Sequence, residues 1–162
     1  MHNILLVDAP DGDATLLASA LRVEGFHVVH ATSATEARKA INGPGYIALA
    51  LVDLMLRTDS PESRTNGIEL ARELKIASPG MRVLLTSAYY LSERQLERAD
   101  CGVSGFIPKP YDVAEVVSFI RTKVAGPPSS RRLWHAEASS GVVERAEASP
   151  PPAPAAGERA RR

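Results

Sequence analysis

The 162-residue sequence has a single cysteine, few aromatic residues and no excess of either charge. With Cys101 alone the chain forms neither an internal disulfide nor a zinc site built from cysteines, so we expect a buried thiol and a reducing, cytoplasmic setting. Lysine plus arginine equals aspartate plus glutamate at 19 each, which gives no indication of nucleic acid or a membrane surface as the partner. No apolar run reaches the roughly 20 residues that span a membrane, and the four histidines lack metal-ligand spacing.

The two ends of the sequence differ in character. The opening MHNILLVDAP lacks a basic segment and its apolar run stops at Asp8, so it predicts a first strand instead of a signal peptide. Residues 126–162 are rich in proline, alanine and arginine, with six of the twelve prolines and six arginines against four glutamates. Such a segment buries too little apolar surface to offset its ordering entropy, so we expect a disordered tail after a domain of residues 1–125. A short partner-bound helix within 131–148 is the alternative.

Short, continuously apolar runs alternate with amphipathic stretches in residues 1–125. Runs such as ILLV and IALALV are typical of strands buried on both faces. The stretches between them carry apolar residues three and four apart, which predicts helices, and Gly25 is expected to end the first. The predicted strands are 3–7, 27–30, 48–52, 82–86 and 103–107, and the predicted helices are 13–24, 33–41, 67–77, 91–98 and 111–124. This order predicts an α/β fold with a five-stranded parallel sheet, doubly wound by helices on both faces.

Polar side chains follow four of the predicted strands. Asp8 comes after the first, Asp53 after the third, Ser87 after the fourth and Lys109 just beyond the fifth. Ligands of open parallel sheets bind outside the carboxyl ends of the strands, so we expect these four groups to share one small volume. Two carboxylates suit a hard cation, while a hydroxyl and an ammonium suit the oxygens of an anion. A phosphoryl group on a carboxylate needs that combination.

Five segments, in this order, resemble the CheY-like receiver domains of bacterial two-component response regulators. They are ILLVDAPD, LVDLML, NGIELARELK, LLTSAYY and GVSGFIPKP. The resemblance covers residues 1 to about 125. It implies the flavodoxin-like receiver fold of five βα units, in a stand-alone signalling domain whose activity is phosphoryl acceptance, with slow autodephosphorylation at most.

The resemblance also implies a role for each strand-end residue. Asp53 would be the phospho-acceptor, attacking the phosphohistidine of a sensor histidine kinase or phosphotransfer protein. Lys109 would pair with the phosphoryl oxygens. Ser87 would move to bond the phosphoryl group, and Phe106 occupies the aromatic switch position.

The same resemblance implies a Mg²⁺ cofactor and a particular rim around the acceptor. Mg²⁺ would be held by Asp8, by Asp53 and by the backbone carbonyl of Met55. Further residues at family positions are Ala88, which would leave the acceptor open, Tyr89, which would modulate phosphoryl lifetime, and Pro110, whose bond to Lys109 would be cis.

Two features depart from the family pattern. Ala9 stands where the family has a second acid that binds the metal directly, so Mg²⁺ binding is weakened or lost unless Asp11 compensates. The loop after Asp53 is also longer, because Gly67 arrives fourteen residues later. Residues 57–66 are either a lid or docking surface, or a tolerated surface insertion.

Three functions follow from these observations. The first is a single-domain response regulator, phosphorylated on Asp53, that acts on an unknown downstream protein and not on nucleic acid. The second is a pseudo-receiver, a constitutive interaction module in which Ala9 has ended metal-assisted transfer. The third is a phosphatase with an aspartate nucleophile, but that chemistry wants an acid two residues later, where Pro10 and Met55 stand.

Overall fold

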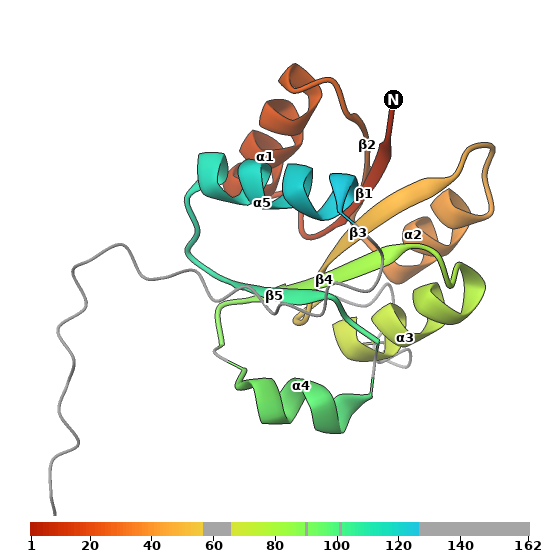
Figure 1. Ribbon diagram of the computed structural model, residues 1–162, viewed down its shortest axis with the longest axis vertical. Coiled ribbons are helices and arrows are strands. Elements are labelled where there is room, and N and C mark those ends of the chain that lie inside the picture. The colour runs from red at the N-terminus through yellow and green to blue at the C-terminus, as the bar shows by residue number, and fades with distance from the viewer. Residues whose placement is uncertain (57–65, 90, 101, 127–162) are drawn as a thin grey trace, which may run out of the picture.

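The computed structural model describes residues 1–56, 66–89, 91–100 and 102–126, and it contains five strands alternating with five helices (Figure 1). The strands are β1 (Asn3–Val7), β2 (His27–Ala31), β3 (Ile47–Asp53), β4 (Arg82–Ser87) and β5 (Gly105–Pro108). The helices are α1 (Gly12–Val23), α2 (Ala34–Ile41), α3 (Gly67–Ala77), α4 (Glu93–Ala99) and α5 (Val113–Ala125). The expectations for residues 57–65 of the long loop, for Cys101 and for the tail from residue 127 fall outside these ranges.

All five strands pair in parallel, in the order β2-β1-β3-β4-β5. Helices α1 and α5 pack on one face of the sheet, and α2 and α3 cover the other, where α4 also lies (Figure 1). The predicted doubly wound α/β fold is therefore confirmed. Because β1 and β3 are central neighbours, the ends of these two strands are fixed side by side.

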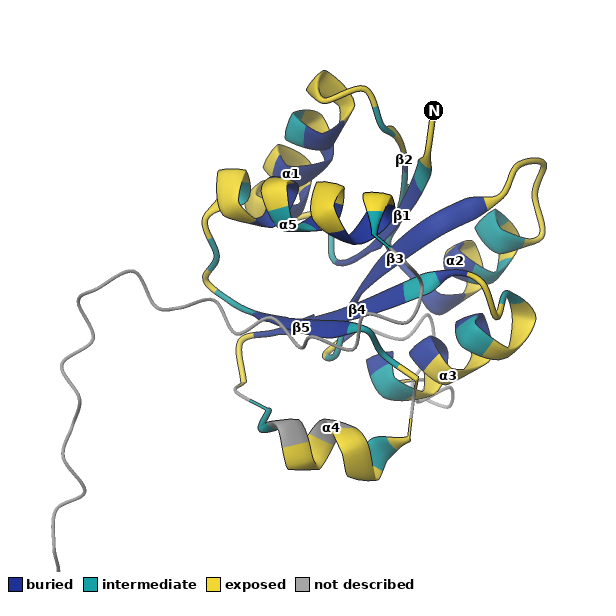
Figure 2. Cartoon of the chain, in the orientation of Figure 1, coloured by how far each residue is buried: buried dark blue, intermediate teal, exposed yellow. Residues whose placement is uncertain are grey.

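Alternate side chains of each strand enter different cores. Leu5 and Val7 of β1 join the core under α2 and α3, whereas Ile4 and Leu6 join the core under α1 and α5. All four are fully buried, and Figure 2 shows the central strands dark blue between helices that are yellow on their outer sides. Burial on both faces explains why the apolar runs of the sequence are continuous.

Every helix begins with a polar side chain that accepts an N–H bond from the first turn. The capping residues are Asp11, Ser33, Asn66, Ser92 and Asp112. These caps correct three predicted starts, because each cap residue itself stays extended: α2 begins at Ala34 instead of 33, α4 at Glu93 instead of 91, and α5 at Val113 instead of 111.

The end of α1 and the start of β5 also test the predicted boundaries. Gly25 follows α1 with a φ of +89°, and its N–H donates to Arg22, so the predicted helix stop is confirmed. The strand predicted over 103–107 begins two residues late, at Gly105. Gly102, with a φ of +65°, makes the turn before it, and Ser104 already donates to the Val83 carbonyl.

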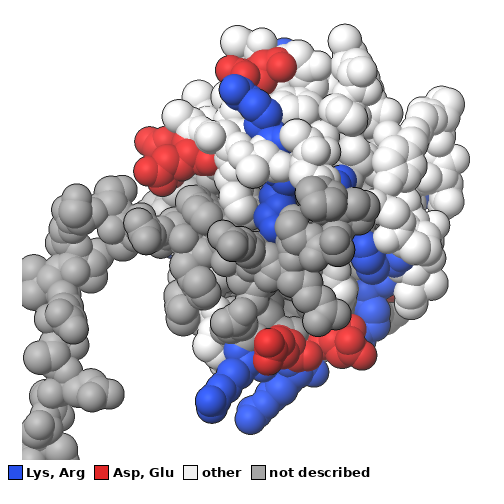
Figure 3. Space-filling view, in the orientation of Figure 1, with Lys and Arg blue, Asp and Glu red and all other residues white. Residues whose placement is uncertain are grey.

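The described surface mixes charges of both signs. Arg121 of α5 pairs with Glu24 at the end of α1, and Arg38 of α2 pairs with Glu73 of α3. Figure 3 shows red and blue groups adjoining one another on the face drawn there. Within the described ranges, no helix combines the length and apolarity needed to cross a membrane.

Candidate functional site

The carboxyl ends of the central strands bring two acids together. Asp53 is the last residue of β3, and Asp8 directly follows β1, whose Val7 is the register partner of Val52. The Asp8 N–H donates to the Ala31 carbonyl at the end of β2, which extends the sheet pairing by one residue. The backbone ladder, rather than a flexible loop, therefore positions both carboxylates.

Lys109 joins these acids from the far end of the chain. Its ammonium Nζ lies 2.8 Å from Asp8 Oδ2 and 2.9 Å from Asp53 Oδ2. The exposed side-chain fractions are 1% for Asp8, 14% for Asp53 and 17% for Lys109. One cation thus bridges two nearly buried anions, a charge-assisted arrangement stronger than a surface ion pair.

Burial and the shared cation move the pKa values of the two acids in opposite directions. Burial raises the pKa of Asp8 to about 6; the Lys109 hydrogen bond opposes this rise, and the Asp53 charge adds to it. Burial also acts to raise the pKa of Asp53, but bonds from Lys109 and the Met55 N–H outweigh it and leave the pKa below its ordinary value. Burial disfavours the Lys109 cation, yet the two carboxylates raise its pKa above the ordinary value. Asp53 is therefore the acid that stays ionised to the lower pH, and Asp8 is the first of the two to take up a proton.

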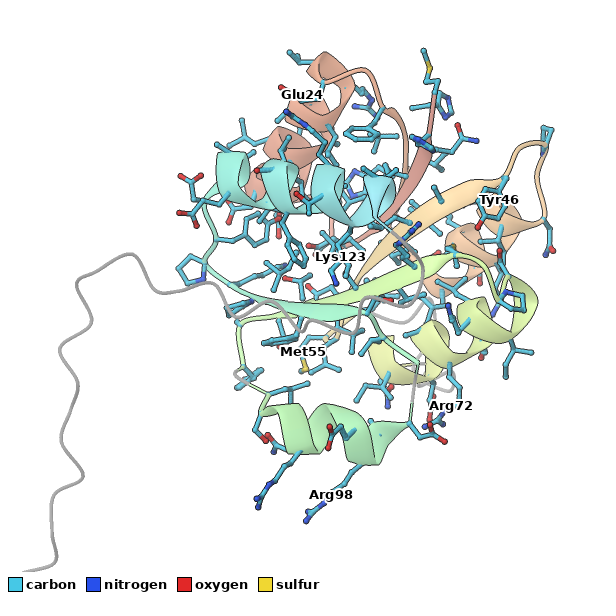
Figure 4. The ribbon with its side chains drawn as sticks, viewed as in Figure 1. Glu24, Tyr46, Met55, Arg72, Arg98 and Lys123 are labelled. Carbon is cyan, nitrogen blue, oxygen red and sulfur yellow. The ribbon has the colours of Figure 1, made fainter. Side chains whose placement is uncertain are left out.

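The second oxygen of each acid is held by the backbone. The Ala9 N–H donates to Asp8 Oδ1 at 2.7 Å, and the Met55 N–H donates to Asp53 Oδ1 at 2.8 Å. Met55, labelled in Figure 4, belongs to the loop that leaves β3, and the residue is 60% exposed. The Ala9 N–H, the Met55 N–H and the Lys109 ammonium thus fix the orientation of the two carboxylates. The directions of their remaining lone pairs are fixed with them.

Ser87 lies at the end of the adjacent strand, β4. It is fully buried, its carbonyl accepts from the Lys109 N–H at 2.8 Å, and its hydroxyl accepts from the Tyr89 N–H at 3.0 Å. The structure therefore places Ser87 beside the Lys109 backbone, but its hydroxyl caps the turn instead of contacting the acids. The O–H proton remains available for donation. Ala88 and Tyr89 are exposed at this rim.

The two residues expected to act around the lysine also have defined positions. Phe106 of β5 is 2% exposed and belongs to the core under α2 and α3. The peptide bond between Lys109 and Pro110 is cis, the geometry that the resemblance implies.

The donor set at this edge suits Mg²⁺, although it is smaller than the family's. Mg²⁺ keeps several waters and is held by one or two carboxylates, which Asp8 and Asp53 can supply. Ala9 contributes only a methyl group, and Asp11 uses its carboxylate to cap α1 through the Ala14 N–H at 2.9 Å. Among the described residues no group of three or more histidine, cysteine or acidic side chains gathers at one place.

Two residues near the acids have no counterpart in the sequence-based prediction. His30 Nε2 lies 3.1 Å from the Asp8 carbonyl oxygen, so this nitrogen donates to the backbone of the acid. Tyr111 has a buried hydroxyl without a hydrogen-bond partner in the described part of the chain. A signal for His30 was present in the sequence, because His30 lies near the end of β2, next to β1, as the register partner of Leu6. No pattern in the sequence marks Tyr111.

A family model and several proteins of known sequence match this chain. The model described as response regulator receiver domain matches residues 4–121. The transcriptional regulatory protein CpxR of Klebsiella pneumoniae is 28% identical over 89% of this chain and 58% of its own length. GlrR of Escherichia coli, also a transcriptional regulatory protein, is 31% identical over 68% of this chain and 23% of its own length. The chain therefore spans between about a quarter and three fifths of these curated relatives.

Solved structures agree with this match. A CheY-like receiver domain protein from Methanospirillum hungatei superposes with a TM-score of 0.64, at 25% identity, over 76% of this chain and 94% of its own. A response regulator from Burkholderia pseudomallei, solved with a phosphorylated aspartic acid, a calcium ion and citrate, gives a TM-score of 0.62 at 26% identity. That match covers 76% of this chain and 69% of the other.

Proposed function

Because this chain belongs to the response regulator receiver domain family, we propose that it accepts a phosphoryl group on Asp53 and signals by binding another protein. The donor is a phosphohistidine of a sensor histidine kinase or phosphotransfer protein, and the setting is the cytoplasm. The observation that carries the proposal is the Lys109 ammonium bridging Asp8 and Asp53 at a strand-end site. The Burkholderia relative, with its phosphorylated aspartic acid, supports the same chemistry.

Asp53 is suited to be the nucleophile because its lowered pKa keeps its carboxylate ionised throughout the neutral range. A carboxylate oxygen attacks the phosphorus, the bond from phosphorus to the donor imidazole nitrogen breaks, and that nitrogen keeps the electron pair and takes up a proton. The product is an acyl phosphate on Asp53. In the unmodified protein the Met55 N–H holds Asp53 Oδ1, which leaves Oδ2 on the side of Lys109.

Lys109 and Ser87 then stabilise the transferred group. Lys109 exchanges its bond to Asp53 Oδ2 for a phosphoryl oxygen, keeping Asp8 as its second partner. The Ser87 hydroxyl turns from the β4 end toward the phosphoryl group, and Phe106 follows into the space behind it, as its switch position implies. The added charge, about −1.5 to −2, is enough to favour one of two arrangements of the neighbouring loops.

Mg²⁺, when bound, neutralises the crowded oxygens of the transition state. Asp8 and Asp53 would hold it, with the Met55 carbonyl as a third ligand and Asp11 as the candidate replacement for the missing acid. Asp8 keeps a free lone pair on each oxygen for this purpose, since Ala9 and Lys109 occupy only one site on each.

A second function, the pseudo-receiver, is favoured by one observation. Ala9 leaves the site one carboxylate short, and Lys109 already neutralises part of the remaining charge. In that case the domain binds its partner in one constitutive arrangement. The downstream partner in either case is a protein, and we propose that residues 1–125 are the folded module that contacts it.

Mass spectrometry after incubation with Mg²⁺ and phosphoramidate tests the proposal. We expect the wild-type chain to gain one phosphoryl group that is lost on treatment with hydroxylamine, which cleaves acyl phosphates. Asp53→Asn is the control that must stay unmodified. Absence of the modification at every Mg²⁺ concentration would exclude phosphoryl acceptance and support the pseudo-receiver.

A further inference from the structure

His30, on the edge strand β2, donates from Nε2 to the carbonyl oxygen of Asp8 at 3.1 Å. It follows Val28 by two residues, and Val28 enters the core under α1 and α5, so the half-buried ring of His30 lies on that face of the sheet. Nε2 carries a proton in the neutral tautomer that makes this bond and also in the cationic ring. The contact therefore does not depend on the charge of the ring.

The bond holds one end of a peptide unit whose other end orients the acid. The Asp8 carbonyl belongs to the peptide that joins Asp8 to Ala9, and the N–H of this same peptide donates to Asp8 Oδ1 at 2.7 Å. Because a peptide unit is planar, a contact that fixes its C=O also fixes the direction of its N–H. A donor on the carbonyl also polarises the amide, which strengthens the bond that its N–H makes.

This peptide lies at the point where the chain leaves the sheet. The Asp8 N–H is still paired with strand β2, through the Ala31 carbonyl at 3.1 Å. After Ala9 the chain turns toward α1, and the Asp11 N–H donates to the Ala9 carbonyl at 2.8 Å. The His30 side chain thus extends the hold of β2 by one further group, to the last peptide before the turn.

The Asp8 carboxylate depends on that peptide because only 1% of the residue is exposed. Its described donors are the Ala9 N–H on Oδ1 and the Lys109 ammonium on Oδ2. Lys109 is shared with Asp53, whereas the Ala9 N–H serves Asp8 alone. A change in the direction of the Ala9 N–H would therefore alter the orientation of Asp8 specifically.

We propose that His30 is a positioning residue of the acidic site, which fixes the Asp8 carboxylate through the Asp8–Ala9 peptide and thereby prepares it to ligate Mg²⁺. The consequence for Mg²⁺ rests on the function proposed above. The orientation of Asp8 does not, because all the contacts belong to the metal-free protein.

The variant His30→Phe removes the donor but keeps a planar ring, and His27→Phe is the matched control. His27 lies on the same strand, as the register partner of Asn3, and is exposed. A second pair of variants differs by one methylene group. His30→Gln carries an amide N–H at about the reach of Nε2 and should restore the contact, whereas the side chain of His30→Asn is too short.

NMR couplings from Asp8 Cγ to its backbone nitrogen and carbonyl carbon report the side-chain torsion of Asp8 in the metal-free protein. We expect a single rotamer in the wild type, His27→Phe and His30→Gln. In His30→Phe and His30→Asn we expect averaging between rotamers. The same single rotamer in every variant would overturn the proposal.

Hydrogen exchange of the Ala9 amide measures its bond to Asp8 Oδ1. Loss of the His30 donor should speed this exchange by about threefold to tenfold, which corresponds to weakening by roughly one ordinary hydrogen bond. The Leu6 amide, from the register partner of His30, should change less. Equal fold-changes at Ala9 and Leu6 would show that His30 serves strand stability alone.

Mg²⁺ titration, followed through the Met55 amide shift, tests the metal-binding part. His30→Phe should weaken binding by about tenfold, the lower end of the range for outer-shell substitutions, and His27→Phe should leave it unchanged. Equal affinities in wild type and His30→Phe would overturn this part. If the wild type itself bound no Mg²⁺, the metal-dependent form of the proposed function would fail, and the Asp8 rotamer and Ala9 exchange would still decide the role of His30.

Discussion

A β-carbon placed on Gly67 would lie 2.2 Å from the carbonyl oxygen of Asp53. Gly67 is the first residue of α3, and its N–H donates to the Leu54 carbonyl at 3.0 Å. The helix therefore begins directly against the backbone of the proposed acceptor. The two ends of the long loop, Leu54 and Gly67, are therefore in direct contact. The length of the loop does not change the position of Asp53 for this reason.

Gly67→Ala should destabilise the fold and disturb the site together. The new methyl group meets backbone atoms that cannot rotate away, so we expect a loss of about 3 kcal/mol in the free energy of unfolding, the upper part of the usual cost of overpacking. Urea denaturation measures it. Gly12→Ala is the control, because Gly12 also begins a helix but has open space around it, and its effect should stay within about 1 kcal/mol. Equal effects of the two substitutions would contradict this account.

Ala9→Asp should strengthen Mg²⁺ binding. The substitution adds a carboxylate beside Asp8 and supplies the anionic oxygen that the site lacks, so we expect an affinity gain of about tenfold or more. Isothermal titration calorimetry gives the affinity directly. Ala9→Asn adds similar bulk without charge and should gain much less. A gain of the same size in both variants would show that shape, and not charge, limits the site.

Lys109→Met should destabilise the fold, because it leaves the charges of Asp8 and Asp53 without a cation. At pH 7 we expect a loss of about 3 kcal/mol in unfolding free energy, because removing one partner of a buried ion pair leaves unpaired charge behind. The deficit should shrink as the pH falls and Asp8 takes up a proton. Lys39→Met removes an exposed lysine of α2 and should change the stability by less than about 0.5 kcal/mol. A Lys109 deficit that did not change with pH would contradict the coupling to Asp8.

Asp8 should make the stability depend on pH between about 4 and 6. Its folded-state pKa, about 6, exceeds the ordinary value of 3.8, so the folded protein retains a proton that the unfolded chain releases in this window. The contribution of Asp8 is therefore fully present below pH 3.8 and is lost as the pH rises to 6. The pKa of Asp53 is lowered, so Asp53 makes the stability depend on pH only below pH 3.8.

Asp8→Asn provides the comparison for that pH dependence. From pH 4 to pH 6 the wild type should lose unfolding free energy steadily relative to Asp8→Asn. Above pH 6 the difference between the two proteins should level off. Chemical denaturation at half-unit pH steps measures it. A difference that stayed constant over this range would show that the Asp8 carboxyl is not perturbed.

The sequence predicts the fold well because its signals are local and repeated. Continuous apolar runs give the strands, and α3 begins and ends as predicted, at Gly67 and Ala77. Errors fall at segment ends where a single cap or turn decides, as at Ser92 and Gly102. The capping box of Ser92 with Gln95 and the left-handed turn at Gly102 set those positions.

The candidate site is predicted only from the rule that ligands of open parallel sheets bind at the carboxyl ends of the strands. That rule brings Asp8, Asp53 and Lys109 together, but it gives no side-chain directions. It therefore does not foresee that the Ser87 hydroxyl accepts from the Tyr89 N–H, or that the buried Tyr111 hydroxyl finds no partner in the described part of the chain. The first is a local turn contact between residues two apart, and the second depends on how the segment after β5 packs against α1 and α5.

The placement of the two acids on adjacent central strands also governs how they can move. Their spacing is set by the same interstrand ladder that pairs Val7 with Val52 in the middle of the sheet. Local opening spares such strands, and amide protons there exchange with solvent only when the whole domain unfolds. A switch in this molecule must therefore work around a rigid carboxylate pair, through rotamers at the ends of β4 and β5 and not by changing the distance between the acids.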